Sequence, residues 1–295
     1  MKSGFVSLVG RPNTGKSTLL NSILETKLAI TSPKAGTTRN IIQGVYEDNN
    51  SQIVFVDTPG IHKPVNKLGN ILNKKAYQTS DNVDLILFLI DIEKGYGKGD
   101  KFILERLKQE NIPIILILNK VDKIKKDTLL EKIKELNEEY DFKEIFPLSA
   151  LKGTNVKELI ETIKKYMPND EKIFDDETFT NISTNFYVSE IVREKVLLKT
   201  KEEVPHSVTC LVENLEHKKD KVIINVLIIV DRLSVKKIIV GKNATMLKEI
   251  GILARKDLEE YFGKRVYLSL FVKVIDNWKE EEKYLKEFGL IEEEK

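Results

Sequence analysis

The string Gly10-Arg11-Pro12-Asn13-Thr14-Gly15-Lys16-Ser17 most constrains how this chain can fold. It has the spacing G-x-x-x-x-G-K-[ST] and stands between an apolar segment, Phe5 to Val9, and a helix-forming segment that begins at Thr18. This pattern is typical of a loop that joins a strand to a helix, where backbone N–H groups and the helix N-terminus bind phosphate oxygens. In such a loop the lysine contacts the β- and γ-phosphates, and the serine hydroxyl binds Mg²⁺. We therefore expect a nucleotide to be bound by Asn13, Thr14, Gly15, Lys16, Ser17 and Thr18.

The first 170 residues alternate apolar segments with helical ones, which predicts a mostly parallel sheet covered by helices on both faces. The predicted strands are Phe5 to Val9, Ile53 to Val56, Leu85 to Ile90, Ile114 to Leu118 and Ile145 to Leu148. Helices are predicted between them, for instance Asp100 to Gln109 and Leu129 to Tyr140. One pair differs, because Ile41 to Tyr46 and Ile53 to Val56 flank a turn-rich segment and so predict a hairpin. We expect an α/β P-loop domain with one antiparallel edge strand.

Three further motifs each follow a predicted strand. In Asp57-Thr58-Pro59-Gly60 the carboxylate can hold the metal through water and the Gly60 amide can meet the γ-phosphate. In Asn119-Lys120-Val121-Asp122 the Asp122 carboxylate can accept hydrogen bonds from guanine N1 and N2, which adenine cannot supply. Backbone amides of Ser149-Ala150-Leu151 can meet the guanine carbonyl. Together they predict a guanine-specific NTPase with these further nucleotide contacts: Asp57, Gly60, Asn119, Lys120, Asp122, Ser149 and Ala150.

The polar segment from Ser32 to Arg39 is predicted to be a switch loop. A threonine in this loop would complete the metal shell with Ser17 and Asp57. We expect Thr38, with Thr37 as the alternative, because a Thr-Arg pair recurs in the proteins that the chain resembles, as described below. We assign the catalytic roles to Lys16, Thr38 and Gly60. Many GTPases orient the attacking water with a glutamine after Asp-x-x-Gly, but this chain has Ile61, so we expect slow hydrolysis. His62 as a general base, or a monovalent cation bound by Asn13, remain alternatives.

The pattern changes after Met167-Pro168, and the acidic residues 171–180 are predicted to be a linker. We expect domain one at 1–170 and an α+β domain at 181–295. The second domain is predicted to contain a helix at Val188 to Leu198, then strands, then a helix from Ala244 to Phe262. A strand with alternating apolar residues (Val266 to Val274) and an acidic C-terminal helix complete it.

Charge in the second domain is segregated. From Arg232 to Lys256 there are seven basic residues against one acidic residue. A glycine turn within this segment, at Gly241, opens a predicted helix, which suits close approach to a sugar-phosphate backbone. The alternative is a plain helix cap with solvated lysines. For the nucleic-acid hypothesis we expect RNA contacts from Lys237, Gly241, Lys242, Asn243, Lys248 and Arg255.

Composition gives no sign of an overall basic or membrane-spanning protein. Forty-eight basic residues stand against 46 acidic ones, so any polyanion must be bound by a local patch. One cysteine, Cys210, is typical of a reducing compartment. No apolar run is long enough to cross a bilayer. We expect a cytoplasmic protein.

The motifs in the first half resemble, in wording and order, those of the Era family of bacterial GTPases. The second half is similar too, through Arg193-Glu194-Lys195, Val204-Pro205-His206-Ser207 and the string from Ile250 to Leu258. The resemblance implies a GTPase domain, with GTP or GDP and Mg²⁺, followed by a type II KH domain. It also implies binding to the 3′ end of small-subunit ribosomal RNA on the pre-ribosomal subunit, in assembly of that subunit. Potassium at Asn13, a monomer and peripheral contact with the cytoplasmic face of the inner membrane are implied as well.

This chain departs from the family pattern at one position. KH domains contact RNA with Gly-x-x-Gly, and here Ala244 replaces the second glycine. If that position requires positive φ, alanine costs about 1 kcal/mol; if it already lies in the first helical turn, alanine costs nothing. Because a helical pattern begins at this residue, we expect the second case.

Overall fold

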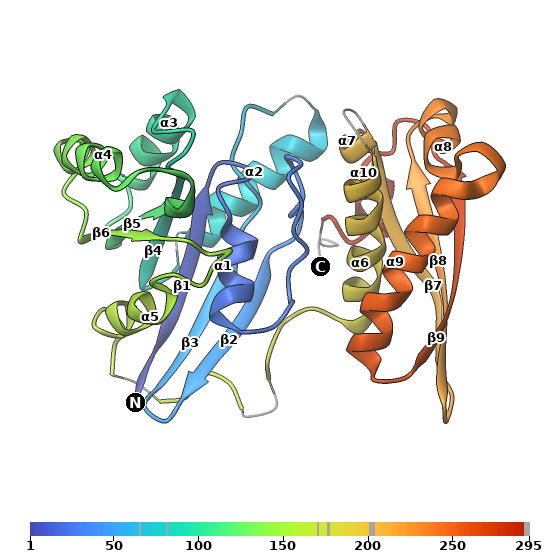
Figure 1. The fold of residues 1–295 in the computed structure, drawn as a ribbon, viewed down its shortest axis with the longest axis horizontal. Coiled ribbons are helices and arrows are strands. Elements are labelled where there is room, and N and C mark those ends of the chain that lie inside the picture. Colours follow the sequence, from blue (N-terminus) through green and yellow to red (C-terminus); the bar gives the residue numbers. More distant parts are fainter. Residues whose placement is uncertain (65, 81, 170, 176–177, 201–203, 292–295) are drawn as a thin grey trace. The chain divides into compact units, whose positions relative to one another are not determined.

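The computed structural model describes residues 1–64, 66–80, 82–169, 171–175, 178–200 and 204–291 (Figure 1). The side chains of Pro205 and His206, in one of the strings that resemble the family, are not among those described. Residues 292–295 of the acidic tail lie outside the described residues. The contacts divide the chain into two compact units. The first comprises residues 1–31, 38–64 and 72–181, and the second comprises 32–37, 65–71 and 182–295.

A six-stranded sheet in the order β2-β3-β1-β4-β5-β6 forms the centre of the first unit. All neighbouring strands are parallel except β2 and β3, which form the predicted antiparallel hairpin at the edge. The strands are β1 (Lys2–Gly10), β2 (Ile42–Asp48), β3 (Ser51–Asp57), β4 (Leu85–Asp91), β5 (Ile114–Asn119) and β6 (Glu144–Leu148). The predicted α/β class with one antiparallel edge strand is confirmed.

Helices lie on both faces of this sheet (Figure 1). One face is covered by an apolar cluster in which Ala76, Ile103 and Leu136 of three different helices pack against Phe88 and Leu116. The central strands are buried at every position, which explains their uninterrupted apolar sequences. The helices are α1 (Lys16–Ile23), α2 (Lys67–Ser80), α3 (Lys98–Leu107), α4 (Lys126–Glu139) and α5 (Val156–Lys164), with a short 3₁₀ turn at Val121–Lys123.

Helix α3 begins earlier than its apolar periodicity suggests. The Asp100 carboxylate accepts a hydrogen bond from the Gly97 backbone N–H at 2.9 Å, which satisfies one of the free donors at the helix N-terminus. The same carboxylate pairs with Arg11 of the phosphate loop at 2.8 Å. The start of α3 is thereby tied to the loop that the sequence predicts to bind phosphate.

The segment predicted to be a linker is hydrogen-bonded to the first unit where it is described. Gln52 Oε1 accepts hydrogen bonds from the Ile173 and Phe174 amides at 2.8 and 2.9 Å. Thr180 donates to the Gln43 carbonyl at 2.6 Å. Residues 176 and 177 lie outside the described residues.

The second unit contains a three-stranded sheet in the order β7-β8-β9, with β7 antiparallel and β9 parallel to β8. Side chains that alternate along β8, such as Val222, Ile224 and Val226, are completely buried in the core. The strands are β7 (Val208–His217), β8 (Lys221–Val230) and β9 (Arg265–Val274), and the helices are α6 (Thr184–Lys199), α7 (Val204–Ser207), α8 (Leu233–Val240), α9 (Thr245–Phe262) and α10 (Glu282–Glu287).

Two sequence expectations for this unit need correction. Helix α8 was not expected as a separate element, because its apolar residues follow the apolar end of β8 with only two polar residues between them. Helix α9 begins at Thr245 and not at Ala244, since Ala244 has a left-handed backbone conformation. Over the described parts of the chain, every helix is too short or too polar to span a membrane.

Candidate functional site

The phosphate loop closes on itself between β1 and α1. Gly15 has φ 96°, in the left-handed region that favours glycine. A Cβ at Gly15 would overlap the side-chain amide of Asn119, so the close approach of these two motifs also requires glycine. Asn13 has φ 65°, which asparagine tolerates better than most residues. Thr14 donates its hydroxyl hydrogen to the Arg11 carbonyl at 2.9 Å.

Lys16 lies inside this loop. Its ammonium donates to the carbonyl oxygens of Gly10 and Arg11, both at 3.0 Å, and the residue is 5% exposed. Burial lowers the pKa of Lys16 to about 8, and the nearby Asp57 carboxylate opposes this shift. A buried cation that donates to carbonyl oxygens is poised to gain from an anionic phosphate.

Three oxygen-bearing side chains that the sequence assigns to a metal converge beside Lys16. Ser17 Oγ lies 2.5 Å from Asp57 Oδ2 and 2.8 Å from Thr38 Oγ1, and Thr38 Oγ1 lies 3.5 Å from the same carboxylate oxygen. The alternative, Thr37, instead donates its hydroxyl to the Lys34 carbonyl at 2.6 Å.

The Asp57 carboxylate is completely buried. Burial raises the pKa of Asp57 to about 6, although the Lys16 ammonium and the bond from Ser17 act in the opposite direction. Among the residues that the structure describes, its second oxygen, Oδ1, has no hydrogen-bond partner. Hydroxyl and carboxylate oxygens are the ligands that Mg²⁺ prefers, so these residues fit the ion.

The segment after Asp57 lies against the phosphate loop. A Cβ at Gly60 would come within 2.8 Å of the Pro12 backbone, so glycine is needed there for space. Ile61 is 2% exposed and packs in the same apolar cluster as Phe88, so it has neither the polar atoms nor the position to orient water. His62 Nδ1 is hydrogen-bonded to the Gly60 carbonyl at 2.9 Å, and Asn73 of α2 binds the His62 backbone.

The two guanine motifs meet the phosphate loop through Asn119. Its Nδ2 donates to the Thr14 carbonyl at 2.8 Å, and its Oδ1 accepts from the Ala150 amide at 3.0 Å. Ser149 donates its hydroxyl hydrogen to Asp122 Oδ1 at 2.6 Å, which orients the carboxylate that the sequence assigns to guanine. The structure thus brings the predicted nucleotide residues of four separate motifs together.

Sequence reasoning missed Asp91 at the end of β4. Its Oδ2 pairs with the Lys120 ammonium at 2.6 Å, and Lys120 also donates to the Asn13 carbonyl at 2.9 Å. Asp91 is 5% exposed. A carboxylate directly after a buried strand was a usable signal, because the carboxyl ends of parallel strands meet at one edge.

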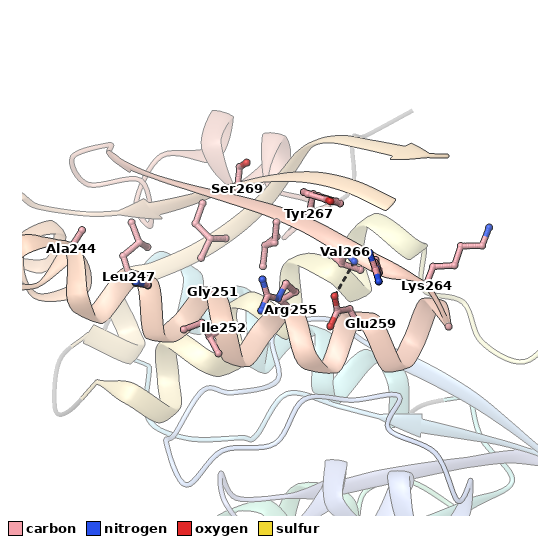
Figure 2. Close-up of a pocket in the computed structure, with 15 residues that line it drawn as sticks. Ala244, Leu247, Gly251, Ile252, Arg255, Glu259, Lys264, Val266, Tyr267 and Ser269 are labelled. Carbon is pink, nitrogen blue, oxygen red and sulfur yellow. Dashed lines mark hydrogen bonds between the residues drawn. The ribbon is translucent and has the colours of Figure 1, made fainter. Parts of the chain in front are cut away.

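A groove of about 1050 Å³ lies between α9 and β9 in the second unit (Figure 2). Apolar side chains such as Leu247 and Ile252 lie along its length, and Lys248 and Arg255 add positive charge. Glu259 also lines it but accepts a hydrogen bond from the Val266 amide at 3.1 Å. Of the predicted RNA residues, Lys248 and Arg255 line the groove, Gly241, Lys242 and Asn243 form the turn before α9, and Lys237 lies on α8.

The groove also has basic residues that the sequence did not indicate, Lys264 and Arg265. Arg265 is the first residue of β9 and Lys264 directly precedes it, so both lie just after the C-terminal end of α9. They lie beyond the basic segment from Arg232 to Lys256, so the charge count over that segment did not include them.

The expectation for Ala244 was wrong. Ala244 has φ 58° and ψ 23° and precedes the first turn of α9. Asn243 before it has φ 51°, and Gly241 has φ 72°. The turn therefore places two non-glycine residues in succession in the left-handed region, and a side chain with a Cβ costs roughly 1–2 kcal/mol there.

Both halves of the chain match known protein families. Residues 5–120 match the family described as 50S ribosome-binding GTPase, and residues 203–279 match the KH domain family. Among solved structures, the chain is similar to Era in complex with MgGDPNP and nucleotides 1506–1542 of 16S ribosomal RNA. The two are 42% identical, with 98% of this chain and 99% of that chain covered and a TM-score of 0.95.

An Aquifex aeolicus Era variant bound to GDP·AlF₄⁻ is equally similar, with 42% identity, the same coverage of both chains and a TM-score of 0.95. The likeness includes both the nucleotide unit and the unit with the groove. This chain belongs to the Era family of GTPases, with a P-loop GTPase domain followed by a KH domain.

Proposed function

We propose that this protein is a GTP-hydrolysing switch that binds the 3′ end of 16S ribosomal RNA and assists maturation of the small ribosomal subunit. The observation that carries the proposal is the likeness over 98% of the chain, at 42% identity, to an Era structure that holds both a GTP analogue and this RNA. The function therefore includes both units, and each unit has a site of matching chemistry.

In the nucleotide unit the residues bind GTP and prepare it for attack by water. Lys16 exchanges its two carbonyl partners for the β- and γ-phosphates. Ser17, Thr38 and Asp57 would hold Mg²⁺, which would neutralise negative charge on the phosphates. The Gly60 amide donates to the γ-phosphate. Since Thr38 and Gly60 both lie on segments that respond to this phosphate, GTP orders them and hydrolysis releases them.

Guanine is selected by Asp122. The carboxylate accepts from N1–H and the N2 amino group, and the hydrogen bond from Ser149 at 2.6 Å fixes its orientation. Asn119 joins this region to the phosphate loop.

This chain has Ile61 at the position where many GTPases have the glutamine that orients water, and the side chain of Ile61 is buried. We propose that Asn13 helps to bind K⁺ beside the phosphates, where a positive charge stabilises the transition state. Turnover measured in KCl and in NaCl at equal ionic strength tests this. A faster rate in KCl that Asn13→Ala removes supports the role, and equal rates in the two salts refute it.

In the KH unit, single-stranded bases lie in the groove between α9 and β9, with their backbone along the Gly241 turn. Lys242, Lys248 and Arg255 contact phosphates, and Leu247 and Ile252 contact bases. Ultraviolet crosslinking to total RNA, in GTP-analogue and GDP states, tests this function. We expect crosslinks at the 3′ end of the small-subunit RNA, through residues 241–255 and stronger with the analogue. Scattered crosslinks that ignore the nucleotide contradict it.

A second candidate is a GTPase whose C-terminal unit docks a protein or a membrane, which the alanine at position 244 favours. Salt dependence separates the two, because RNA binding must weaken steeply as salt rises.

We further propose that the protein acts as a monomer and makes peripheral contact with the inner membrane. Sedimentation and flotation with anionic vesicles measure these two properties.

A further inference from the structure

Strand β9 has two different faces. Val266 and every second residue after it are buried or half-buried, whereas the residues between them are exposed. Because side chains alternate across a strand, the exposed set points away from the helices. Figure 2 shows Tyr267 and Ser269 on the side of β9 that faces away from α9. Beside its groove, the second unit therefore has a separate sheet surface.

This surface is apolar along its middle. Tyr267 and Phe271 of β9 are 57% and 54% exposed. In the register of the sheet they stand beside Ile223 and Leu227 of β8, which are half-buried. The next strand, β7, adds Leu211 opposite Leu227.

Positive charge flanks these aromatic side chains. Arg265 and Lys273 stand on the same face of β9 at either end of the pair, and both are exposed. The Lys221 ammonium lies 4.9 Å from the centre of the Tyr267 ring, which is within reach of a cation–π interaction. We call the surface formed by Ile223, Leu227, Arg265, Tyr267, Phe271 and Lys273 the outer face.

Exposed aromatic rings on a sheet, flanked by basic side chains, are suited to stacked bases with phosphates alongside. The outer face is also continuous with the groove. Within the described residues β9 is an edge strand, with β7 at the other edge, and Arg265, Tyr267 and Ser269 line the groove as well. A KH groove holds about four nucleotides, so an RNA longer than this must continue beyond the groove.

We propose that the outer face is a second RNA-binding surface, on which nucleotides that leave the groove cross the edge at β9 and stack on Tyr267 and Phe271. This inference rests on the proposed RNA function. Arg265 and Lys273 bind the phosphates on either side of the stacked bases. The outer face then adds affinity for longer RNA without reading its sequence, because every base can stack.

The test compares two RNA oligonucleotides from the 3′ end of 16S RNA, one of about five nucleotides and one of about twelve. The face variant is Phe271→Ala with Lys273→Ala, both outside the groove lining. We expect it to weaken binding of the longer RNA about tenfold or more and to leave the shorter RNA unaffected. The slope of log affinity against log salt should fall by about 0.7 for the lost phosphate contact.

Two controls make the outcome clear. Phe102→Ala with Lys98→Ala removes a similar exposed pair from α3 of the nucleotide unit and should leave both affinities unchanged. Lys248→Ala with Arg255→Ala removes groove contacts and should weaken both RNAs. All variants should keep the thermal unfolding midpoint of the unmodified protein.

Each other result has a definite meaning. Equal binding of the longer RNA by the face variant and the unmodified protein overturns the inference while the groove function stands. Equal loss for both RNAs also overturns it, because the effect then acts through the groove. A dimer that the face variant dissociates assigns the surface to a second copy of the chain. If the groove variant itself binds both RNAs normally, the proposed RNA function fails.

Discussion

Ala244 adopts a backbone conformation that a residue with a Cβ reaches only at a cost. At φ 58° the methyl group crowds the neighbouring carbonyl, while glycine would be free of this strain. We expect Ala244→Gly to raise the free energy of unfolding by about 0.5–1 kcal/mol, since the strain removed exceeds the added entropy of the unfolded chain. Chemical denaturation measures this change.

The same substitution should affect RNA binding. Without the Cβ, the turn from Gly241 can approach a sugar-phosphate backbone more closely, so we expect tighter binding of RNA. For the change in stability, Asn243→Gly is the matched control, because Asn243 also has positive φ but asparagine tolerates it. If both variants change stability equally, the strain at Ala244 is not special.

Asp122 is predicted to decide between guanine and other bases. Asp122→Asn replaces an acceptor oxygen by a donor, and hydrogen bonds to a charged group contribute about 1.5–3 kcal/mol. We expect GTP affinity to fall by about 10–100-fold. ITP, whose base lacks the N2 amino group, provides the comparison. The preference for GTP over ITP should shrink in the variant, and an unchanged preference would assign base selection to another residue.

At the scale of elements, Asp48 joins the β2–β3 hairpin to helix α5. Its carboxylate accepts hydrogen bonds from the Asn50 and Ser51 amides at 3.0 and 2.9 Å, and it pairs with Lys164 at 2.6 Å. Burial alone would raise the pKa of Asp48, but the bonds from Lys164, Asn50 and Ser51 outweigh it and hold that pKa below its usual range. A hairpin at the edge of the sheet is thus fixed to the helix beside it.

This carboxylate makes stability depend on pH. A depressed pKa stabilises the folded protein above the unfolded value of about 3.9, and the contribution is lost as pH falls below that value. We expect Asp48→Asn to lower the free energy of unfolding by about 1–2 kcal/mol at pH 7, with a smaller difference in acid. Glu138→Gln, at an exposed position of α4, is the control and should have little effect. A constant difference from pH 7 to pH 3 would exclude this linkage.

The elements that sequence predicted best are those encoded locally. Strands buried on both faces have continuous apolar runs, and the phosphate loop needs its glycine and lysine at fixed spacing. Helix α8 was missed because its apolar residues follow those of β8 with only Asp231 and Arg232 between them. Asp91 directly follows a continuous apolar run, but its partner Lys120 comes beside it only because β4 pairs with β5, a distant part of the chain.

At the scale of the whole molecule, each unit has its own sheet and its own buried core. We therefore expect two transitions in calorimetric unfolding. A ligand stabilises only the unit that it binds, by about 2.7 kcal/mol at a concentration a hundred times its dissociation constant. GDP with Mg²⁺ should raise the transition of the nucleotide unit, and a 16S RNA oligonucleotide should raise that of the KH unit.

Removal of Mg²⁺ sharpens this prediction. If Ser17, Thr38 and Asp57 hold Mg²⁺ as proposed, chelation removes a charge that would offset burial of the Asp57 carboxylate. Chelation should then reduce the shift caused by the nucleotide and leave the shift caused by RNA. Lys16→Ala should remove the nucleotide shift alone, because it deletes the phosphate contact without touching the groove. A single transition whose midpoint is raised equally by both ligands would mean that the two cores unfold together as one cooperative unit.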